Sequence, residues 1–371
     1  MNSACHFRRA GRGRRGPRLA NGGSAIVVAK RPTIYDVAER AGVSKSLVSL
    51  VLRDSPRVSD EKREAVLAAV TELNYTPSRL AAGLAGTRTR SVGVVIDDFS
   101  NLWFVDALAG LRAALAAGGY TLSVADSSLN AHLRLDPIEA FRALRVDGLV
   151  LAGEASADAV TRSGVPAVVL GVRALSAELP ELPVVDSDEV AGGRLAVQHL
   201  AGLGHRRIAC VSGPGASAGQ RERGYLEAMQ ELGLEVSIAR APDTGEAAAR
   251  EVARELLAAG SRGAAGRSGS IPTAVFAVND PMAAGVIGAA RELGLAVPSD
   301  LSVVGYDDSP LAAYGLVSLT TISGDPRELG EAAGRALVAR LEGDASRIES
   351  CSFTPRLVQR GSAVGVSAVT P

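Results

Sequence analysis

The chain has 371 residues, of which 47% are hydrophobic, 22% charged and 4% aromatic, so it is long enough for two or three domains with aliphatic cores. Forty basic residues balance forty acidic ones, and no apolar run reaches the ~18 residues that would predict a membrane span. Cys5, Cys210 and Cys351 lie far apart and form no CxxC motif. This spacing disfavours a disulfide framework or a metal site and favours a protein of the reducing cytoplasm. We also expect no cofactor.

The net charge of zero hides an asymmetry along the chain. Residues 1–30 carry six Arg and one Lys with no acidic residue, and residues 31–90 carry ten basic and seven acidic residues. A basic amino-terminal end on an acidic remainder is typical of a nucleic-acid-binding head joined to a separate body. The Gly- and Arg-rich extension, residues 1–30, is expected to be disordered. It is either a basic arm that adds non-specific DNA affinity or the product of a misassigned translation start.

Residues 33–73 have the pattern of three short helices. Thr33 and Asp36 form a capping-box-like pair at the start of the first helix, and Gly42 allows the chain to leave that helix in a left-handed conformation. Ser59 is expected to cap the third helix. Each helix has one apolar face; these faces comprise Ile34, Val37 and Ala38, then Leu47, Val48 and Val51, then Val66, Ala69, Val70 and Leu73.

The second helix is predicted from residue 45 to about 52, after a cap at Ser44. Its outward positions carry Lys45, Ser46 and Ser49, which are short donors suited to base edges and phosphates. A helix, a turn containing glycine and a second helix that opens with small polar and basic residues form the helix-turn-helix plan. A generic three-helix bundle would explain the apolar faces but not this polar helix start, so we predict DNA binding.

The run from Thr33 to Ser44, with Val48-Ser49, closely resembles the DNA-binding head of the lactose-repressor (LacI) family. The run from Leu73 to Ala81 resembles that family's hinge. The helix pattern and the resemblance together imply that these residues bind DNA: Thr33, Tyr35, Ser44, Lys45, Ser46, Ser49, Arg53, Asn74, Tyr75, Ser78, Arg79, Ala81 and Leu84.

The resemblance also gives the hinge a role. Pro77 suits a helix start, but Gly83 makes an isolated helix here unfavourable by about 1 kcal/mol relative to Ala. In the LacI family, paired hinge helices form on DNA and a leucine wedges a minor-groove base step apart; Leu84 is the matching residue. A plain interdomain linker is the alternative. One departure lies in the head: members usually carry Arg where this chain has Leu50, which puts the family's guanine contact in question, although Arg53 lies one turn further on.

Apolar runs alternate with amphipathic stretches along residues 91–362, which predicts a doubly wound α/β body with parallel sheets, divided into two lobes by a cleft. Gly- and Ser-rich residues 260–270 are predicted to be a surface loop. The expected strands are Val92–Ile96, Thr121–Ala125, Gly148–Ala152, Ala167–Leu170, Ile208–Val211, Ala274–Val278 and Ser302–Gly305. The expected helices lie near 103–117, 134–144, 189–203, 219–232, 246–259, 281–293 and 326–342.

Polar side chains and one tryptophan follow the predicted strands, where open α/β sheets bind ligands. Carboxylates and amides satisfy hydroxyl pairs and an aromatic ring stacks on the apolar face of a sugar, so this set suits a polyhydroxylated ligand. Any of them can instead cap a helix, and for Asp280 we expect only that. The set is Asp97, Asp98, Asn101, Trp103, Asp126, Ser127, Asn279, Asp280, Asp307 and Asp308.

The resemblance to the LacI family continues through the body, at 146–148, 204–208, 272–274, 279–280, 302–308 and 319–321. These segments look like the family's effector domain, which has the periplasmic-binding-protein-like fold. The resemblance implies a ligand-responsive regulator, most simply a repressor with an activator as the variant, that acts at the nucleoid. It is expected to bind a palindromic operator as a homodimer or a higher oligomer, with a sugar or a similar small polar effector. The expected effector-binding residues are Asp98, Trp103, Phe104, Arg173, Arg221, Asn279 and Asp307.

The expected organisation is therefore an all-α helix-turn-helix head joined to a two-lobed α/β body. Its segments are a basic extension (1–30), the head (31–76), a hinge helix and linker (77–90), an effector-binding and dimerisation domain (91–362) and a tail (363–371).

Three alternatives compete with this interpretation. An enzyme could use Asp97-Asp98 or Asp307-Asp308 as paired carboxylates, but adjacent residues tend to point apart, and the sequence has no nucleophile elbow, metal-ligand spacing or phosphate-binding loop. A secreted sugar-binding protein would need a signal peptide rather than a helix-turn-helix. A regulator without an effector would not need a cleft rich in Asp, Asn and Arg. We therefore expect no catalytic activity and no membrane partner.

Overall fold

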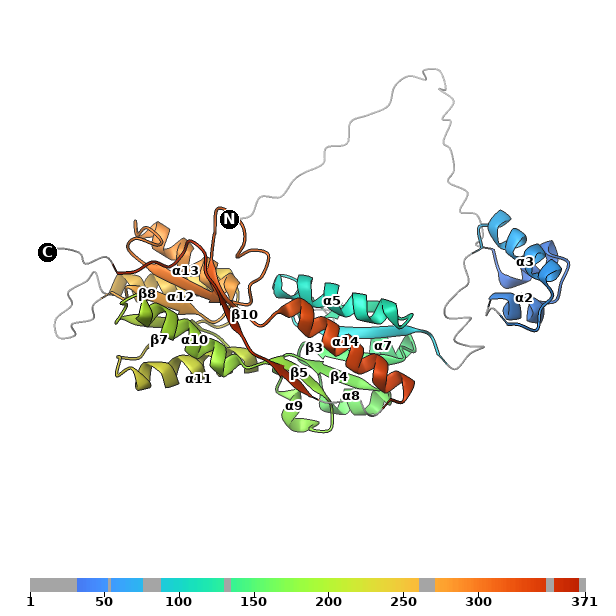
Figure 1. Cartoon of the computed structure of the whole chain (residues 1–371), viewed down its shortest axis with the longest axis horizontal. Coiled ribbons are helices and arrows are strands. Elements are labelled where there is room, and N and C mark those ends of the chain that lie inside the picture. Colours follow the sequence, from blue (N-terminus) through green and yellow to red (C-terminus); the bar gives the residue numbers. More distant parts are fainter. Residues whose placement is uncertain are drawn as a thin grey trace, which may run out of the picture. The chain divides into compact units, whose positions relative to one another are not determined.

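The computed structural model describes residues 32–52, 55–75, 88–129, 135–259, 271–344 and 350–366. The chain divides into two compact units, Met1–Ser78 and Arg79–Pro371 (Figure 1). No helix within the described ranges has the length and apolar character needed to cross a membrane. The predictions for the basic extension, for the hinge helix around Leu84 and for the loop at 260–270 lie outside the described residues.

The described part of the head contains α1 (Ile34–Arg40), α2 (Lys45–Leu52) and α3 (Asp60–Glu72). Thr33 and Asp36 form the predicted capping box at α1, and Gly42 has a φ of 64° in the turn before α2. The predicted cap at Ser59 is wrong in detail, because its side chain makes no capping hydrogen bond. The head's apolar core comprises Val37, Ala38, Val48, Val51, Val58, Val66, Ala69 and Tyr75.

The body contains two sheets in its described residues, and each is covered by helices on both faces. The sheet of lobe 1 has the strand order β11-β5-β4-β3-β1-β2, and all its pairs are parallel. Its elements are β1 (Ser91–Ile96), α5 (Trp103–Ala117), β2 (Thr121–Asp126), α7 (Pro137–Ala143), β3 (Gly148–Ala152), α8 (Ala157–Ser163), β4 (Ala167–Leu170), α9 (Leu175–Glu178), β5 (Val184–Ser187), α14 (Pro326–Glu342) and β11 (Cys351–Phe353).

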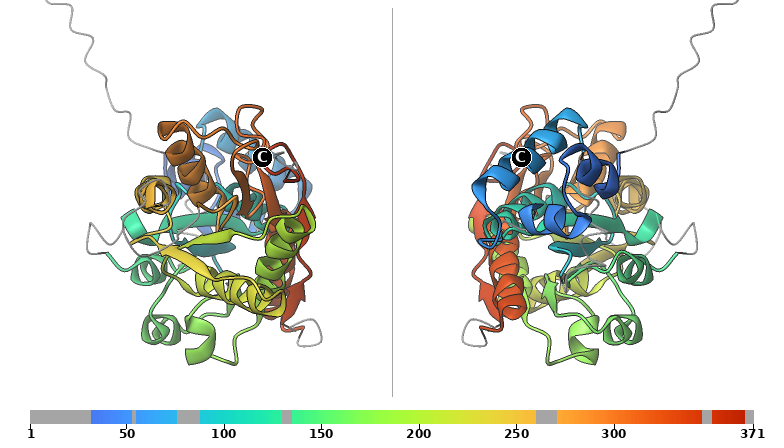
Figure 2. Two further views of the ribbon diagram at one scale, coloured as in Figure 1. Left: turned by 90° about the vertical axis from the view of Figure 1, so that its left-hand side faces the viewer. Right: turned by 90° about the vertical axis from the view of Figure 1, so that its right-hand side faces the viewer.

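The sheet of lobe 2 has the order β12-β10-β9-β8-β6-β7, and only β12 is antiparallel to its neighbour. Helices α10 and α11 lie together, apart from α12 and α13 (Figures 1 and 2). The elements are α10 (Glu189–Gly202), β6 (Ile208–Ser212), α11 (Ala216–Glu231), β7 (Ser237–Arg240), α12 (Glu246–Ala259), β8 (Ala274–Ala277), α13 (Asp280–Glu292), β9 (Ser302–Tyr306), β10 (Thr320–Ser323) and β12 (Arg356–Val358).

Burial on both faces explains why the central strands are apolar runs rather than alternating patterns. In β1, Val94 and Ile96 pack in the cluster under α5 and α14, whereas Val95 packs in the cluster under α7 and α8. The structure thus confirms the predicted fold class, a helical head and two parallel α/β lobes. The described chain crosses between the lobes three times, at β5–α10, β10–α14 and β11–β12.

Candidate functional site

A cavity of about 390 Å³ is lined by residues from both lobes of the body. The lining residues follow β1, β3 and β4 in lobe 1 and β6, β7, β8 and β9 in lobe 2, and one more lies at the start of α10, after β5. In the sheets, β1 lies between β2 and β3, and β6 lies between β7 and β8. The cavity therefore lies where strand order reverses in each sheet, which is where α/β folds bind ligands. Its lining is Asp97, Asn101, Trp103, Phe104, Glu154, Gly171, Arg173, Glu189, Pro214, Gly215, Ala216, Ser217, Ala218, Arg221, Thr244, Val278, Asn279 and Asp307.

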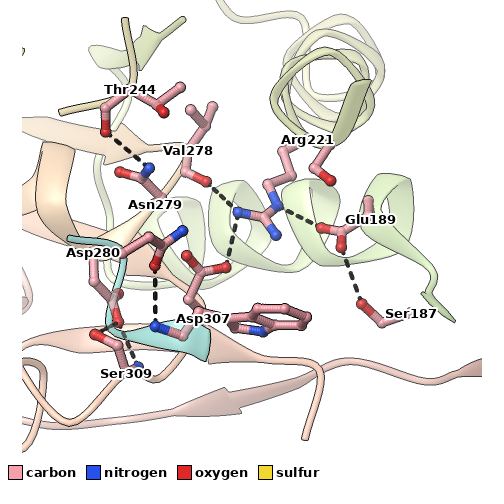
Figure 3. A network of polar contacts seen from close by, with 12 residues as sticks. Ser187, Glu189, Arg221, Thr244, Val278, Asn279, Asp280, Asp307 and Ser309 are labelled. Atoms are coloured by element: carbon pink, nitrogen blue, oxygen red, sulfur yellow. Dashed lines mark hydrogen bonds and ion pairs between the residues drawn. The ribbon is translucent and has the colours of Figure 1, made fainter. Parts of the chain in front are cut away.

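The lobe 2 wall is built around a buried arginine on α11. The guanidinium of Arg221 donates through Nε to the carboxylate of Glu189, and its Nη1 lies 3.0 Å from Asp307 Oδ1 and 2.7 Å from the carbonyl oxygen of Val278 (Figure 3). Its Cζ lies 3.7 Å from the ring centroid of Tyr306. One cation thus faces two carboxylates in a site removed from water.

Burial changes the protonation of this cluster. It raises the pKa of Asp307 to about 7, although the charge of Arg221 opposes this rise. For Arg221, burial lowers the pKa, but the charges of Asp307 and Glu189 outweigh it and the net shift is upward. Arg221 therefore stays charged, whereas Asp307 gains a proton more easily than an ordinary aspartate does.

Asn279 caps α13 and lines the same wall. Its Oδ1 accepts from the backbone N–H of Met282 at 2.8 Å, and its Nδ2 donates to the carbonyl of Thr244 at 3.0 Å. The expectation that Asp280 caps this helix is wrong, because the helix begins one residue earlier than predicted and Asp280 lies inside it. The carboxylate of Asp280 is buried and accepts from the hydroxyls of Ser309 at 2.8 Å and Thr321 at 2.6 Å.

The lobe 1 wall is more open and carries the aromatic side chains. Trp103 and Phe104 begin α5, with ring centroids 5.1 Å apart in an edge-to-face arrangement. The backbone N–H of Trp103 donates to Asn101 Oδ1 at 3.0 Å. Arg173 follows β4, and its Nη1 lies 3.4 Å from Asp97 Oδ2. The Arg173 Nε is buried with no hydrogen-bond partner among the described residues.

One predicted effector residue does not line the cavity. Asp98 accepts from the backbone N–H and the hydroxyl of Ser100, at 2.7 and 2.6 Å, and so stabilises the loop before α5. The neighbouring Asp97 lines the cavity in its place, because adjacent residues leaving a strand point to different sides. The other six predicted residues, Trp103, Phe104, Arg173, Arg221, Asn279 and Asp307, all line it; their role in ligand binding stays a prediction.

Other strand-end side chains predicted as candidates hold loops together. Asp126 accepts from the backbone N–H groups of Phe99 and Leu129, both at 2.8 Å, and Asp308 accepts from Arg360 at 2.6 Å. Conversely, sequence reasoning missed Glu154 and Glu189. Glu154 comes two residues after β3, so its place at a strand end could have identified it. Glu189 lies at a helix start, where the sequence cannot distinguish a site residue from an acid that stabilises the helix dipole.

Two further cavities of about 680 Å³ each lie elsewhere in the body. One is lined by the ends of α7, α8 and α14, at the amino-terminal edge of the lobe 1 strands, and the other by the faces of α5 and α14. Neither lies at the carboxyl ends of the parallel strands, so the smaller interlobe cavity is the candidate ligand site.

In the head, most of the predicted DNA-binding residues that the structure describes are exposed. Tyr35, Ser44, Lys45, Ser46 and Asn74 are exposed and Ser49 is half-buried. Lys45 Nζ donates to the Tyr35 hydroxyl at 3.2 Å and lies 4.8 Å from its ring centroid.

Two of the predicted head residues have structural tasks. The hydroxyl of Thr33 is part of the capping box of α1 and donates to the carboxylate of Asp36 at 2.7 Å. Tyr75 is only 9% exposed and packs in the head's core, and burial raises its pKa. This burial disfavours Tyr75 as a contact to a base or a phosphate. Arg53, Ser78, Arg79, Ala81 and Leu84 lie outside the described residues.

Comparisons with known proteins agree with this architecture. The family described as bacterial regulatory proteins, lacI family, matches residues 33–78, and the periplasmic binding protein-like domain matches residues 197–363. The chain is 32% identical over 340 residues to the HTH-type transcriptional regulator DegA of Bacillus subtilis, which covers 90% of this chain and 98% of DegA. The chain belongs to the LacI family. It is thus a DNA-binding transcriptional regulator and not an enzyme.

Other members resemble this LacI-family regulator over similar lengths. The ribose operon repressor of Escherichia coli is 33% identical over 345 residues, covering 89% of this chain and 99% of that protein. The lac repressor dimer bound to operator and the anti-inducer ONPF matches with a TM-score of 0.74, 29% identity and coverage of 91% of this chain and 100% of that one. A CelR–cellobiose complex matches with a TM-score of 0.64, 31% identity and coverage of 90% and 100%.

Proposed function

We propose that this LacI-family regulator represses transcription by binding a palindromic operator as a homodimer, and that a sugar or a similar small polar molecule in the interlobe cavity controls that binding. The observation that carries the proposal is the buried Arg221–Asp307–Glu189 cluster on one cavity wall, opposite the lobe whose wall carries Trp103 and Phe104. We assign DNA reading to residues 31–76, the hinge to 77–90 and effector binding and dimerisation to 91–362.

The composition of the cavity suits a polyol. A volume of about 390 Å³ falls in the range of small-molecule sites. Aromatic rings on the lobe 1 side can stack on the apolar face of a sugar, and Asp307 and Asn279 on the lobe 2 side can bond its hydroxyls. Because Arg221 and Arg173 already face carboxylates, the site favours uncharged hydroxyls over an anionic group. The names of relatives support the same class, since one is a ribose operon repressor and another structure is a cellobiose complex.

Arg221 connects the proposed ligand site to one of the crossovers between the two lobes. Its partner Glu189 also accepts from the hydroxyl of Ser187, at 3.2 Å, and these two residues flank the β5–α10 crossover. A ligand that contacts both walls therefore acts one side chain away from a connection between the lobes. The effect on operator affinity is a coupling free energy of ~1–3 kcal/mol, typical of allosteric proteins.

Exposed apolar side chains support dimerisation. Tyr314 and Leu316, in the segment between β9 and β10, are exposed, as are Phe99, Val105 and Leu129 in lobe 1. The backbone N–H groups of Phe99 and Leu129 both donate to Asp126, which brings these two residues close together. Neighbouring exposed apolar side chains are typical of protein–protein contacts. A symmetric dimer would present two heads to two half-sites, as a palindrome requires. Such a regulator acts in the cytoplasm, at the nucleoid.

The test starts from the full-length protein and a panel of sugars and polyols. A ligand at 100 times its dissociation constant stabilises the protein by about 2.7 kcal/mol and should raise its unfolding temperature. The same compound should change the fluorescence of Trp103, the only tryptophan in the chain, and should alter affinity for DNA selected from a random duplex library. Weaker DNA binding with the sugar indicates induction of a repressor, and tighter binding indicates a corepressor. Selection that yields no sequence motif would refute the DNA part of the proposal.

A further inference from the structure

The outward face of α2 carries one apolar side chain among polar ones. Residues three and four apart on a helix share a face, which groups Lys45 with Ser49 and Ser46 with Leu50. Lys45, Ser46 and Leu50 are exposed and Ser49 is half-buried. α2 is the second helix of the helix-turn-helix, which enters the major groove in this fold, so Leu50 belongs to the surface that meets the base edges.

Leu50 differs from every other large apolar residue of α2. Val48 and Val51 are buried in the head's core, and Leu47 and Leu52 pack against it, whereas Leu50 is 39% exposed. A single exposed leucine is common on protein surfaces. Its place on the base-reading face is what makes it informative, because a side chain there is dehydrated when DNA binds.

The chemistry of a leucine restricts what it can read. It offers no donor or acceptor, so it cannot pair with guanine O6 and N7, with adenine N6 and N7 or with cytosine N4. The thymine C5-methyl group is the largest apolar group that a base pair presents in the major groove, where cytosine offers only its small C5–H. A polar base edge dehydrated against Leu50 would be left without a hydrogen bond, which is unfavourable.

We propose that Leu50 contacts a thymine methyl group and thereby specifies a T·A pair at one position of each operator half-site. The inference rests on the proposed function, because it requires sequence-specific DNA binding through α2. Ser46, Ser49 and Lys45 supply the polar contacts around it, with Lys45 oriented by its bond to the Tyr35 hydroxyl.

The experiment removes the methyl group alone. Duplexes selected by the full-length wild-type protein from a random library define the half-site, and each thymidine in it is then replaced in turn by deoxyuridine. Losing one buried methyl contact should weaken binding about fourfold, and about 15-fold when both half-sites are changed, if each group contributes as a buried methylene does. We expect this loss at one thymine position, measured by fluorescence anisotropy.

Two variants assign the contact to Leu50. Leu50→Ala should bind the thymidine and deoxyuridine duplexes equally at that position, while its unfolding temperature stays close to that of the wild type because the site is exposed. Leu67→Ala is the matched control, since Leu67 is a leucine of the same head, 48% exposed, on α3 rather than α2. It should keep the wild-type sensitivity to deoxyuridine. Leu50→Arg should move the preference at the same position towards guanine.

Each outcome decides between the two proposals. Equal binding of every deoxyuridine duplex by the wild type, or undiminished sensitivity in Leu50→Ala, would overturn the thymine contact while leaving sequence-specific binding intact. Selection that gives no motif would overturn both this inference and the DNA part of the proposed function. A thymine whose methyl group matters to the wild type and to Leu67→Ala, but not to Leu50→Ala, would establish the contact.

Discussion

The two walls of the interlobe cavity differ in how firmly their charged side chains are held. On the lobe 2 wall, Arg221 is buried and is bonded to two carboxylates and a backbone carbonyl. On the lobe 1 wall, Arg173 is as buried as Arg221 and donates to the carbonyl of Ala152, but it pairs with a single carboxylate, that of the more exposed Asp97 at 3.4 Å, and its Nε has no partner among the described residues. Under the proposed function, this difference in ion pairing leads us to propose that lobe 2 is the preorganised anchor for the ligand and that lobe 1 is the wall that adjusts when the ligand binds.

The largest effect is expected from removing the anchor. Arg221→Ala leaves Glu189 and Asp307 buried without their cation, which typically destabilises a protein by about 3–5 kcal/mol. Urea unfolding followed by circular dichroism measures this loss. The variant should also lose ligand binding. Because stability and ligand binding fall together in this variant, milder variants are needed to compare the two walls. A stability unchanged within about 0.5 kcal/mol would contradict the description of the cluster as buried and ion-paired.

Asp307→Asn is the milder variant of the same wall. It keeps the shape of the side chain but removes an acceptor for ligand hydroxyls, so ligand affinity should fall by about 1–3 kcal/mol, or roughly tenfold and more. Trp103 fluorescence titration with the sugar identified in the panel measures the dissociation constant. Asp98→Asn is the control, because Asp98 bonds Ser100 and not the cavity, and it should bind as the wild type does. Equal affinities in Asp307→Asn and the wild type would remove Asp307 from the site.

The protonation of Asp307 makes the stability of the folded protein depend on pH. Burial raises the pKa of Asp307 from the ordinary aspartate value of 3.8 to about 7, so the folded state binds this proton more tightly than the unfolded state does. The resulting stabilisation is fully present below pH 4 and is lost as pH rises through 7. The unfolding temperature of the wild type should therefore fall relative to that of Asp307→Asn between pH 5 and pH 8. A constant difference across this interval would show that Asp307 is charged throughout.

The smallest effect is expected on the lobe 1 wall. Arg173→Ala removes one ion pair, to the partly exposed Asp97, and a bond to the Ala152 carbonyl. Because it leaves one partly exposed carboxylate without its cation rather than two buried ones, stability should fall less than in Arg221→Ala. If lobe 1 closes on the ligand, ligand affinity should fall less than tenfold, while the change in Trp103 fluorescence on binding becomes smaller. A loss of ligand affinity as large as that of Asp307→Asn would contradict the distinction between the lobe 2 anchor and the lobe 1 closing wall.

The sequence predicted the long elements well because their periodicity is strong. Residues 103–117, 246–259 and 326–342 were predicted as helices with the bounds that the structure has. It did not predict β5, β7, β10, β11 or β12, whereas β4 and β8, which are as short as β5 but apolar and buried throughout, were predicted. In β5 and β7 several residues are only half-buried, and such segments carry too few apolar positions to stand out.

The site could be predicted in outline but not in detail. Strand ends pointed to Trp103, Asn279 and Asp307, since parallel strands bring their carboxyl ends together. Asp97 lines the cavity and Asp98 does not, because a one-residue difference at a strand end decides which way a side chain points. The part that Glu189 plays depends on Arg221, 32 residues away in the chain, and no local pattern reports such a pairing.

The central claim is that a ligand held between the two walls controls DNA binding by the head. Its most direct test is the dissociation constant for the selected duplex, measured by anisotropy with and without the identified sugar, for the wild type and Asp307→Asn side by side. For the wild type we expect the sugar to change this constant about 5- to 150-fold. For Asp307→Asn we expect an unchanged constant without sugar, and at least about tenfold more sugar to reach the same response. A sugar that changes Trp103 fluorescence but leaves the wild-type constant for DNA unaltered would contradict the account.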